Sequence, residues 1–507
     1  MAEFLLEIYT EEVPAEMHSE IIFSKLLDFF AKNFSTDRAG VKFYTTPVRM
    51  VFLCNLSDKF TVKSEIIRGP KISAPQQALE GFVKKYAITL NSLGKNGEHY
   101  EYTTPEKNLD TADILPQKIA EFLVDSQKIW VKTMRWNGTF EWIRPIRGIT
   151  AIFNQKPLDG NIFGVKISNA VRGCKFSSPV NTKEIHCAEE YFEFLTSESI
   201  ILNTANRIEE IINKIKGKTA IDDDFFTKQA MVITEAANLC EIPHVILGKI
   251  DEKFKNLPTE VIHTVMKNHQ KYIPINTEAF AIVVDKKIST QAQESSILAG
   301  NMRVLNARLE DALFFYKNDK NTPPDIFEDR LKNIAFHPKI GSIYDRIPRI
   351  TWIFEEISRK INLKNAEECL KTIKFMKLDL GSEMVAEFPE LQGIMGQKYF
   401  SIGEASRLQY QNTAEITAIS QENSAIILAE WLEYCISLMC GGEIPTSSRD
   451  PFGIRRRLKN IAQLIQISSM PGVVNAAFIQ EISLKFASHY KLEITSQVKN
   501  NINQIIL

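Results

Sequence analysis

The sequence predicts an α+β fold, with a mixed N-terminal half followed by an all-helical C-terminal region. In the first half, short apolar and β-branched runs alternate with stretches of helical spacing. From Pro258 onward, apolar residues recur at helical spacing almost without interruption. The length of 507 residues and the 44% hydrophobic content are sufficient for several domains, each with its own core.

The first half begins with a strand and a helix. Residues 4–9 form a short apolar run, and Ile22, Leu26 and Phe30 then recur at the spacing of an amphipathic helix. The polar, turn-rich sequence over 91–110 predicts an exposed connection. Further strands are expected over 48–53, 148–153 and 231–234.

The second half reads as a series of helices. Pro258 suits the start of a helix, and Val261, Val265 and Met266 repeat behind it. The sequence Asn321-Thr-Pro-Pro324 is typical of a domain boundary. Helices are expected over 301–316, 331–334, 348–362, 426–439 and 454–467.

Composition and charge narrow the class of protein. The net charge of −1 gives no bulk attraction to nucleic acid, so any RNA contact must come from local basic patches. The seven cysteines are odd in number and form no C-x-x-C pair, which favours free thiols in a reducing compartment. No signal-peptide pattern and no apolar run long enough to span a membrane is present. We therefore expect a cytoplasmic protein.

Three basic segments are candidates for RNA contact. The first, Lys132 to Arg147, interleaves Arg135 and Arg144 with aromatic residues, which suits base stacking and phosphate binding but equally suits ordinary strand pairs. The second places His263, Lys267 and Lys271 four residues apart, which predicts one cationic helix edge, either solvated or in contact with an RNA backbone.

The third basic segment is the run Arg455-Arg-Arg457, preceded by Arg449 and followed by Lys459. Three consecutive arginines fan around more than half of a helix, so at least one should face solvent. Salt bridges and capping within the fold are the alternative use of these side chains.

The sequence lacks the motifs of several common nucleotide-binding, nucleophilic and metal sites. The sequence has no Walker-type phosphate loop, no G-x-G-x-x-G and no G-x-S-x-G. His263 and His269, the closest histidine pair, are too far apart for two ligands on one α-helical face, so we expect no metal site and no catalytic residue in this chain.

The stretch Met384-Val-Ala-Glu-Phe-Pro-Glu-Leu-Gln-Gly-Ile-Met-Gly396 is the most informative segment. Met384, Val385 and Phe388 suit a core, Pro389 ends the helix, and the two glycines suit positive φ or close backbone approach. Its residue order resembles a signature of the β subunit of bacterial tetrameric glycyl-tRNA synthetase. Further matching blocks are Leu6-Glu-Ile-Tyr-Thr-Glu-Glu-Val-Pro14, Thr46-Pro-Val-Arg49, Met266-Lys-Asn-His-Gln-Lys-Tyr272, Ala307-Arg-Leu-Glu-Asp-Ala312 and Pro445-Thr-Ser-Ser-Arg-Asp-Pro-Phe452.

The resemblance implies a tRNA-binding subunit that does not itself make an adenylate. Two α and two β subunits would form the enzyme, with ATP and Mg²⁺ used by the α subunit and tRNA for glycine placed by the β subunit. The regions implied are an α+β part with a B3/B4-like region at 1–255, a helical linker at 256–324, an HD-like helical domain at 325–470 and a short helical segment at 471–507.

The sequence departs from the family at three places. Cys174-Lys175 stands where the family usually has His-Arg, and Ala429-Glu-Trp-Leu-Glu433 replaces an Ala-Asp-Lys-Leu-Asp block. The third departure is that the family's anticodon-binding body is expected to be missing after the arginine run. Separately, the HD-like region has no His-Asp dipeptide. A metal-dependent HD phosphohydrolase and a purely structural scaffold are the alternative functions.

Overall fold

The structure is a computed structural model whose content is 52% helix and 19% strand, which confirms the α+β class. It describes residues 1–492 except Lys63, Glu65, Asn137, Thr139, Ser178, Thr417, Ser447, Ser448, Ser469 and 471–473. The chain folds into two compact units. The first comprises Met1–Gly248, Lys271–Ile273 and Phe280–Leu298, and the second comprises Lys249–Gln270, Pro274–Ala279 and the described residues from Ala299 onward.

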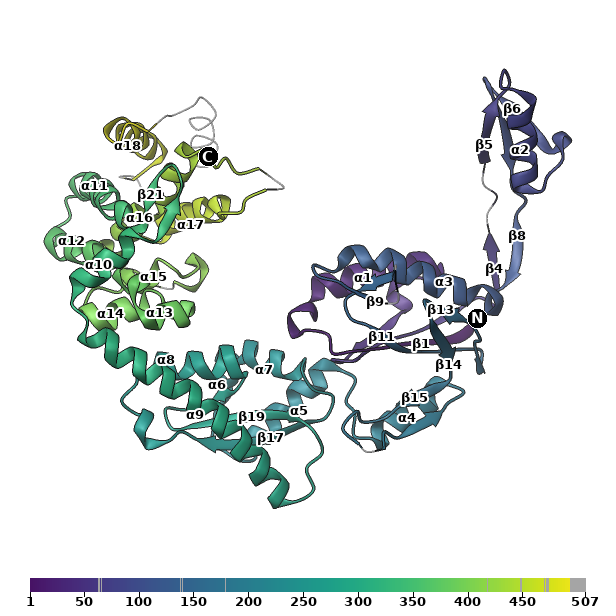
Figure 1. Ribbon diagram of the computed structural model, residues 1–507, viewed down its shortest axis with the longest axis horizontal. Helices are drawn as coiled ribbons and strands as arrows, with labels where there is room; N and C mark the ends of the chain where they lie inside the picture. Colours follow the sequence, from purple (N-terminus) through teal and green to yellow (C-terminus); the bar gives the residue numbers. More distant parts are fainter. Residues whose placement is uncertain are drawn as a thin grey trace. The chain divides into compact units, whose positions relative to one another are not determined.

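The first unit contains most of the strands (Figure 1). Its helices are α1 (Glu20–Phe34), α2 (Gln76–Tyr86), α3 (Thr111–Ser126), α4 (Ala188–Ser197), α5 (Thr204–Lys216), α6 (Asp223–Lys228) and α7 (Ala230–Ala237). The strands of its central sheet, in order across the sheet, are β13 (Asn161–Ile162), β14 (Val165–Ser168), β11 (Ile146–Phe153), β1 (Ala2–Thr10), β3 (Arg49–Leu56) and β2 (Lys42–Thr45), with β12 (Lys156–Pro157) beside β11.

Strand β1 lies between β11 and β3 and contributes apolar side chains to both faces of the sheet. Phe4, Leu6 and Ile8 point into a core formed with α1 and α3, whereas Leu5 points into a second core formed with α4. Figure 1 shows α1 and α3 on one side of the sheet and α4 and β15 on the other. Because successive side chains of a strand point to opposite faces, this one strand contributes to two cores. The strands expected over 4–9, 48–53 and 148–153 are confirmed.

The segment expected to be an exposed connection, 91–110, is in fact built from strands. Asn96 pairs with His99 across the two-residue turn Gly97-Glu98, in which Gly97 has a φ of 57°. The paired strands are only four residues (Leu93–Asn96) and five residues (His99–Thr103) long, so their alternation gives a weak signal in the sequence. The small sheet has the order β5 (Ile66–Lys71), β7 (His99–Thr103) and β6 (Leu93–Asn96), and β4 (Lys59–Val62) pairs separately with β8 (Lys107–Asp110).

The strand expected over 231–234 is wrong, because these residues belong to helix α7. The β-branched run suggested a strand, but Val232, Ile233, Ala236 and Ala237 are buried at helical spacing while Met231 is exposed. The remaining strands of the first unit are β9 (Met134–Trp136), β10 (Phe140–Trp142), β15 (Ala170–Arg172), β16 (Thr182–Glu184), β17 (Pro243–Lys249), β18 (Ile273–Pro274) and β19 (Ala279–Asp285).

The second unit is helical and is organised around α16 (Gln421–Cys440), of which nearly every residue is buried. Its expected helix over 454–467 is confirmed with the same bounds, whereas the helix expected over 331–334 is mostly the end of α10 and a following turn. The other elements are α8 (Thr259–Thr264), α10 (Pro324–Lys332), β20 (Ala335–His337), β21 (Gly341–Ser342), α11 (Ile343–Ile361), α12 (Ala366–Phe375), α13 (Glu383–Glu387), α14 (Ile394–Phe400), α15 (Ala405–Leu408), α17 (Ile454–Ile467) and α18 (Ala476–His489). Helix α9 (Gln291–Asn321) belongs to the first unit up to Leu298 and to the second unit from Ala299. Of the C-terminal segment expected at 471–507, residues 471–473 and 493–507 lie outside the described residues.

A buried charge network joins α11 to α16. Glu430 and Glu433 lie about one turn apart on α16, and both are buried. Arg346 of α11 donates Nε to Glu433 at 2.6 Å and Nη2 to Glu430 at 2.8 Å. Arg349 donates Nε to Glu433 at 2.8 Å, and Lys377 donates Nζ to Glu430 at 2.9 Å. Each carboxylate is therefore held by at least two cations.

The pKa values in this network follow from burial and charge together. Burial by itself raises the pKa of Glu430, but Lys377, Arg457 and Arg346 together hold it well below its usual range. Burial lowers the pKa of Lys377 to about 8, and the neighbouring arginines act in the same direction. Glu430 thus supplies the negative charge that offsets the desolvation cost of its three cationic partners.

The segment 384–396 forms the turn that its sequence predicted. Met384, Val385 and Phe388 are buried, and Gly393 has a φ of 79°. A Cβ on Gly393 would lie 2.2 Å from the carbonyl oxygen of Ser406, and a Cβ on Gly396 would lie 2.7 Å from its hydroxyl. Both glycines are therefore required by close approach, and Gly393 also by its backbone conformation.

The carboxylate of Asp379 holds this turn in place through hydrogen bonds to its backbone. Its Oδ2 accepts the backbone N–H groups of Gly393 and Gly396. Burial raises the pKa of Asp379 to about 6, although both of these hydrogen bonds act to lower it. One buried carboxylate therefore satisfies two backbone donors at the start of α14, where the first N–H groups have no partner within the helix.

Replacing Glu430 by Gln should lower the free energy of unfolding of the second unit by about 3–5 kcal/mol, because three buried cations lose a shared counter-charge. Urea denaturation followed by circular dichroism measures this change. Glu481→Gln is the matched control, since Glu481 pairs with Lys485 on an exposed face of α18 and its loss should change little. Equal effects of the two substitutions would contradict a structural role for the buried network.

Gly393→Val should lower the stability by about 3 kcal/mol or more, because a side chain there meets a backbone oxygen and requires an unfavourable φ. Thermal unfolding measures it. Gly300→Ala serves as the control, since an added Cβ at Gly300 has no neighbour within 4 Å and lies in helix α9. We expect that variant to melt no lower than the parent. A wild-type melting curve for Gly393→Val would rule out the strained turn.

Candidate nucleic-acid interface

The arginine run occupies the first turn of α17, where its orientation is fixed from both ends. Gly453 precedes the helix at a φ of 63°, and the Asp450 carboxylate accepts the N–H groups of Ile454 at 2.9 Å and Arg455 at 3.0 Å. Ile454 and Leu458 are buried in the helical core. Because successive residues turn by about 100°, this phase directs Arg455 and Arg456 outward.

Arg457 is the one arginine of the run that points inward. Its Nη1 donates to Glu430 Oε2 at 2.9 Å, and its guanidinium lies 4.3 Å from the ring centre of Tyr434. Arg457 therefore anchors α17 to α16 through a buried charge and an aromatic face. The three arginines proposed as one contact surface divide into one structural side chain and two exposed ones.

The exposed cations on and before α17 form one surface, which we call the α17 basic edge: Arg449, Arg455, Arg456 and Lys459. Thr446 holds two of them together, because its Oγ1 accepts the N–H of Arg449 at 3.0 Å and its carbonyl accepts Nη1 of Arg455 at 3.3 Å. Arg455 and Lys459 are one turn apart on the helix. None of the four has an ion pair among the described residues, so their charge remains available.

Lys267 and Lys271 do not form the cationic helix edge that their spacing predicted. A π-helical turn over Val265–His269 replaces the α-helical register, and Lys271 lies beyond it at a φ of 57°. Lys271 pairs with Glu235 at 2.8 Å. Burial lowers the pKa of Lys267 and of His263. The three side chains are spaced four residues apart in the sequence, but the backbone is not α-helical over this segment, so they do not share one helix face.

Arg135 and Arg144 are both engaged in contacts within the first unit. Arg135 on β9 faces Glu141 on β10 and pairs with it at 3.2 Å. Arg144 donates Nε to the carbonyl of Glu12 at 2.9 Å and Nη1 to its own neighbour Ile143 at 2.9 Å. Lys132 is exposed, and Asn137 lies outside the described residues.

The aromatic residues of this segment serve the core. Phe140 and Trp142 are buried, and Phe140 stacks on Phe163 with ring centres 3.9 Å apart. Only Trp136 is half exposed, and it meets Phe140 edge to face. These geometries match the strand-pairing alternative for the segment better than a stacking platform for bases.

Lys175, at the first departure from the family pattern, is also paired. It contacts Glu12 at 2.5 Å and Asp285 at 3.3 Å. Burial alone lowers the pKa of Lys175, but these two carboxylates raise it overall. A cation is thus retained at the position where the resemblance implies arginine. The second departure supplies Glu430 and Glu433, so the carboxylates of that block are retained as well.

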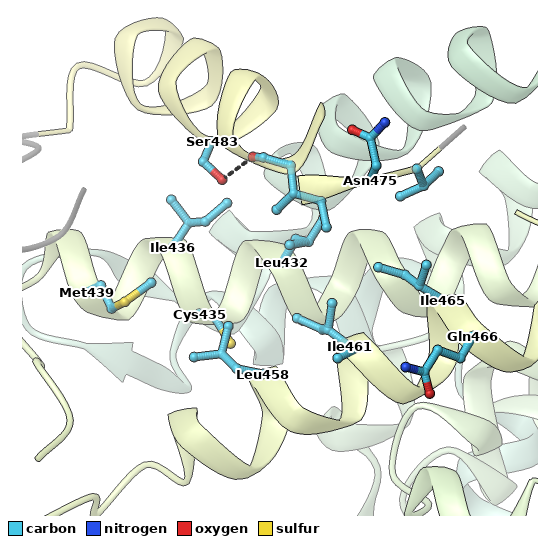
Figure 2. A pocket seen from close by; sticks show the side chains of 13 residues that line it. Leu432, Cys435, Ile436, Met439, Leu458, Ile461, Ile465, Gln466, Asn475 and Ser483 are labelled. Atoms are coloured by element: carbon cyan, nitrogen blue, oxygen red, sulfur yellow. Dashed lines mark hydrogen bonds between the residues drawn. The ribbon is translucent and has the colours of Figure 1, made fainter. Parts of the chain in front are cut away.

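A cavity in the second unit is lined by other residues of α17 and is mainly apolar, unlike the α17 basic edge. Its volume is about 200 Å³. Figure 2 shows the lining side chains from α16, α17 and α18. Leu432, Ile436 and Ile461 are among its lining, and Ser483 turns its hydroxyl to the carbonyl of Ile479 at 2.7 Å. None of the described residues that line it is charged. These residues therefore offer no positive charge to a phosphate.

Other classes of site are not found in the part of the chain that the structure describes. No group of three or more His, Cys, Asp or Glu side chains there is placed to hold a metal ion. No helix there is both long and apolar enough to cross a membrane. All seven cysteines are free thiols, as their number and spacing predicted.

The sequence has relatives along almost its whole length. The family model described as glycyl-tRNA synthetase beta subunit matches residues 4–505. The chain is 33% identical to the glycine–tRNA ligase beta subunit of Rickettsia bellii, over 97% of this chain and 76% of the relative. It is also 33% identical to that of Rickettsia prowazekii, over 99% of this chain and 76% of the relative. The chain therefore belongs to the family of glycyl-tRNA synthetase β subunits.

Proposed function

We propose that this chain is the tRNA-binding, non-adenylating subunit of a glycine–tRNA ligase. Its partner would be an α subunit that forms glycyl-adenylate from ATP with Mg²⁺, in an assembly of two α and two β subunits. The observation that carries the proposal is the family match over residues 4–505. The sequence also lacks the phosphate-loop motifs by which a chain would hold a nucleotide itself.

The α17 basic edge is the surface of the second unit that best suits an RNA backbone. Guanidinium groups present several donors in a fixed fork that matches phosphate oxygens. Arg455 and Arg456 are already oriented by the Asp450 cap and by the Arg457–Glu430 pair. Pre-oriented side chains lose less conformational entropy on binding, so the same contacts give a higher affinity.

Local charge has to supply this affinity, because the whole chain carries a net charge of −1. Phosphate contacts of this kind position a nucleic acid without reading its bases. Specificity for glycine tRNA would then come from contacts elsewhere in the assembled enzyme. Of the seven basic residues proposed from the sequence, Arg455 and Arg456 are the two whose charge is exposed and unopposed by a carboxylate.

The isolated chain should show no glycine-dependent exchange of pyrophosphate into ATP, and adding the α subunit should restore the exchange. The reason is that adenylate formation needs a nucleotide site that this sequence does not provide. The assay compares each chain alone with the mixture. Robust exchange by the β chain alone would contradict the division of labour, and divalent metal retained by that purified chain would favour the phosphohydrolase alternative instead.

The double variant Arg455→Gln, Arg456→Gln should bind glycine tRNA more weakly at low salt and flatten the dependence of log K on log salt by roughly 0.7 to 0.9 per lost contact. Arg457 is left intact because it holds Glu430. Binding titrations at several salt concentrations measure the slope.

The matched control for this prediction is Lys364→Gln, Lys371→Gln, which removes two exposed charges from the same unit. That variant should keep the wild-type slope. If the arginine variant folded normally with an unchanged slope, the α17 basic edge would not be the RNA contact. If the wild-type enzyme showed no salt-dependent affinity for tRNA at all, the scaffold alternative would hold.

A further inference from the structure

A second recess lies wholly within the first unit and differs in chemistry from everything described so far. It has a volume of about 630 Å³, which is within the usual range of roughly 300–1,000 Å³ for ligand sites. Strand β2 and helix α4 form one wall, and helix α5 with residues 286–288 forms the other. We call it the α4–α5 groove.

Helix α5 presents a polar stripe to the groove. Asn203, Asn206, Glu210 and Lys214 follow one another at steps of three and four residues, so they share a face. Arg207 lies at the buried edge of this stripe, between it and the buried Ile211 and Ile215. Its guanidinium donates to the carbonyl oxygens of Ala237, Ile201, Leu202 and Thr45. This buried side chain holds the polar stripe opposite β2.

Two half-buried aromatic rings line the facing wall. Tyr44 comes from β2 and Phe192 from α4, and their ring centres are 5.6 Å apart at an angle of 73°. Both pack on the core of the first unit and also contribute to the groove lining. Such rings offer a flat apolar surface that any nucleic-acid base can stack on.

The charge of the groove is positive. Lys286 and Lys287 directly follow β19, are exposed, and have no ion pair among the described residues. Lys214 pairs with Glu210 at 2.9 Å, so the one carboxylate in the lining is already neutralised. The amide of Asn206 is exposed on the same side and can both donate and accept hydrogen bonds.

We propose that the α4–α5 groove binds an unpaired nucleotide of RNA, with its base against Tyr44 and Phe192 and its phosphate at Lys286 and Lys287. Asn206 would contact the edge of the base. The combination of aromatic rings, amide and two unopposed lysines is what an unstacked nucleotide requires, because it exposes a flat base and an anionic phosphate together. The inference rests on the proposed tRNA-binding function and adds a contact surface in the first unit.

Two variants test the two halves of the groove in the full chain assembled with its α subunit. Lys286→Gln, Lys287→Gln should reduce the salt slope for a short unstructured RNA by about 0.7 per lost contact. Phe192→Leu should weaken the same RNA about tenfold, whereas Phe192→Tyr should retain binding because it keeps a ring. An RNA duplex of equal length should compete poorly.

The control for the lysine variant is Lys166→Gln, Lys183→Gln, which removes two exposed charges from the first unit away from the groove. It should behave as wild type, and thermal unfolding should be unchanged in both lysine variants. The inference about the groove would be overturned if the groove variants bound the short RNA with wild-type affinity. The proposed function would still stand in that case, provided that the parent protein binds tRNA.

Competition by an acidic peptide but not by the short RNA would also overturn the inference. Loss of tRNA binding in the parent would reject the proposed function, and the short-RNA titration would still decide the groove.

Discussion

The pairing of two buried glutamates with four cations is the constraint on which the helical unit depends. Glu430 and Glu433 lie on the most deeply buried helix, where an uncompensated carboxylate would be prohibitively costly. The compensating charges come from separate elements: Arg346 and Arg349 from α11, Lys377 from the turn after α12, and Arg457 from α17. The helices can therefore pack in only the arrangement that brings these side chains together.

This constraint also determines what the surface can present. Arg457 is fixed inside by Glu430, so the helical rotation of α17 is set, and Arg455 and Arg456 point outward as a consequence. The block containing both glutamates is one in which the sequence departs from the pattern it resembles. The departure retains acidic side chains at the two positions that accept the arginines, which explains how the fold tolerates it.

The first unit uses the same principle with different elements. Arg49 is completely buried and pairs with Glu7 at 2.9 Å and with Glu241 at 2.8 Å, which ties β3 to β1 and to the segment before β17. Arg207 performs the equivalent task for α5 through four backbone carbonyls. Arg207 links the two walls of the α4–α5 groove, since it joins α5 to Thr45 of β2, while the lysines that remain exposed give the groove its charge.

Errors in the sequence-based assignment share a physical cause. The strands of the hairpin near Gly97 have only four and five residues, which is too short for a clear alternating pattern. In α7, Val232 and Ile233 favour a strand in isolation, although they pack as part of a helix. In both cases packing against neighbouring elements decides the structure. The π-helical turn after Val265 is a further case, because it changes the register of Lys267 and Lys271 without a change in residue type.

The sequence alone determined the family, the α+β class, most helices of the second half, the need for small residues at Gly393 and Gly396, and the free state of the cysteines. These properties depend on residue order and on local periodicity, which are visible along the chain. Only the tertiary structure decided which cations are available, since the partners are distant in sequence: Arg457 meets Glu430, Lys271 meets Glu235, and Lys175 meets Glu12 and Asp285. The Lys286-Lys287 pair was visible in the sequence, but Tyr44 and Phe192 join it only through folding, because a binding surface is assembled from side chains that the chain itself keeps far apart.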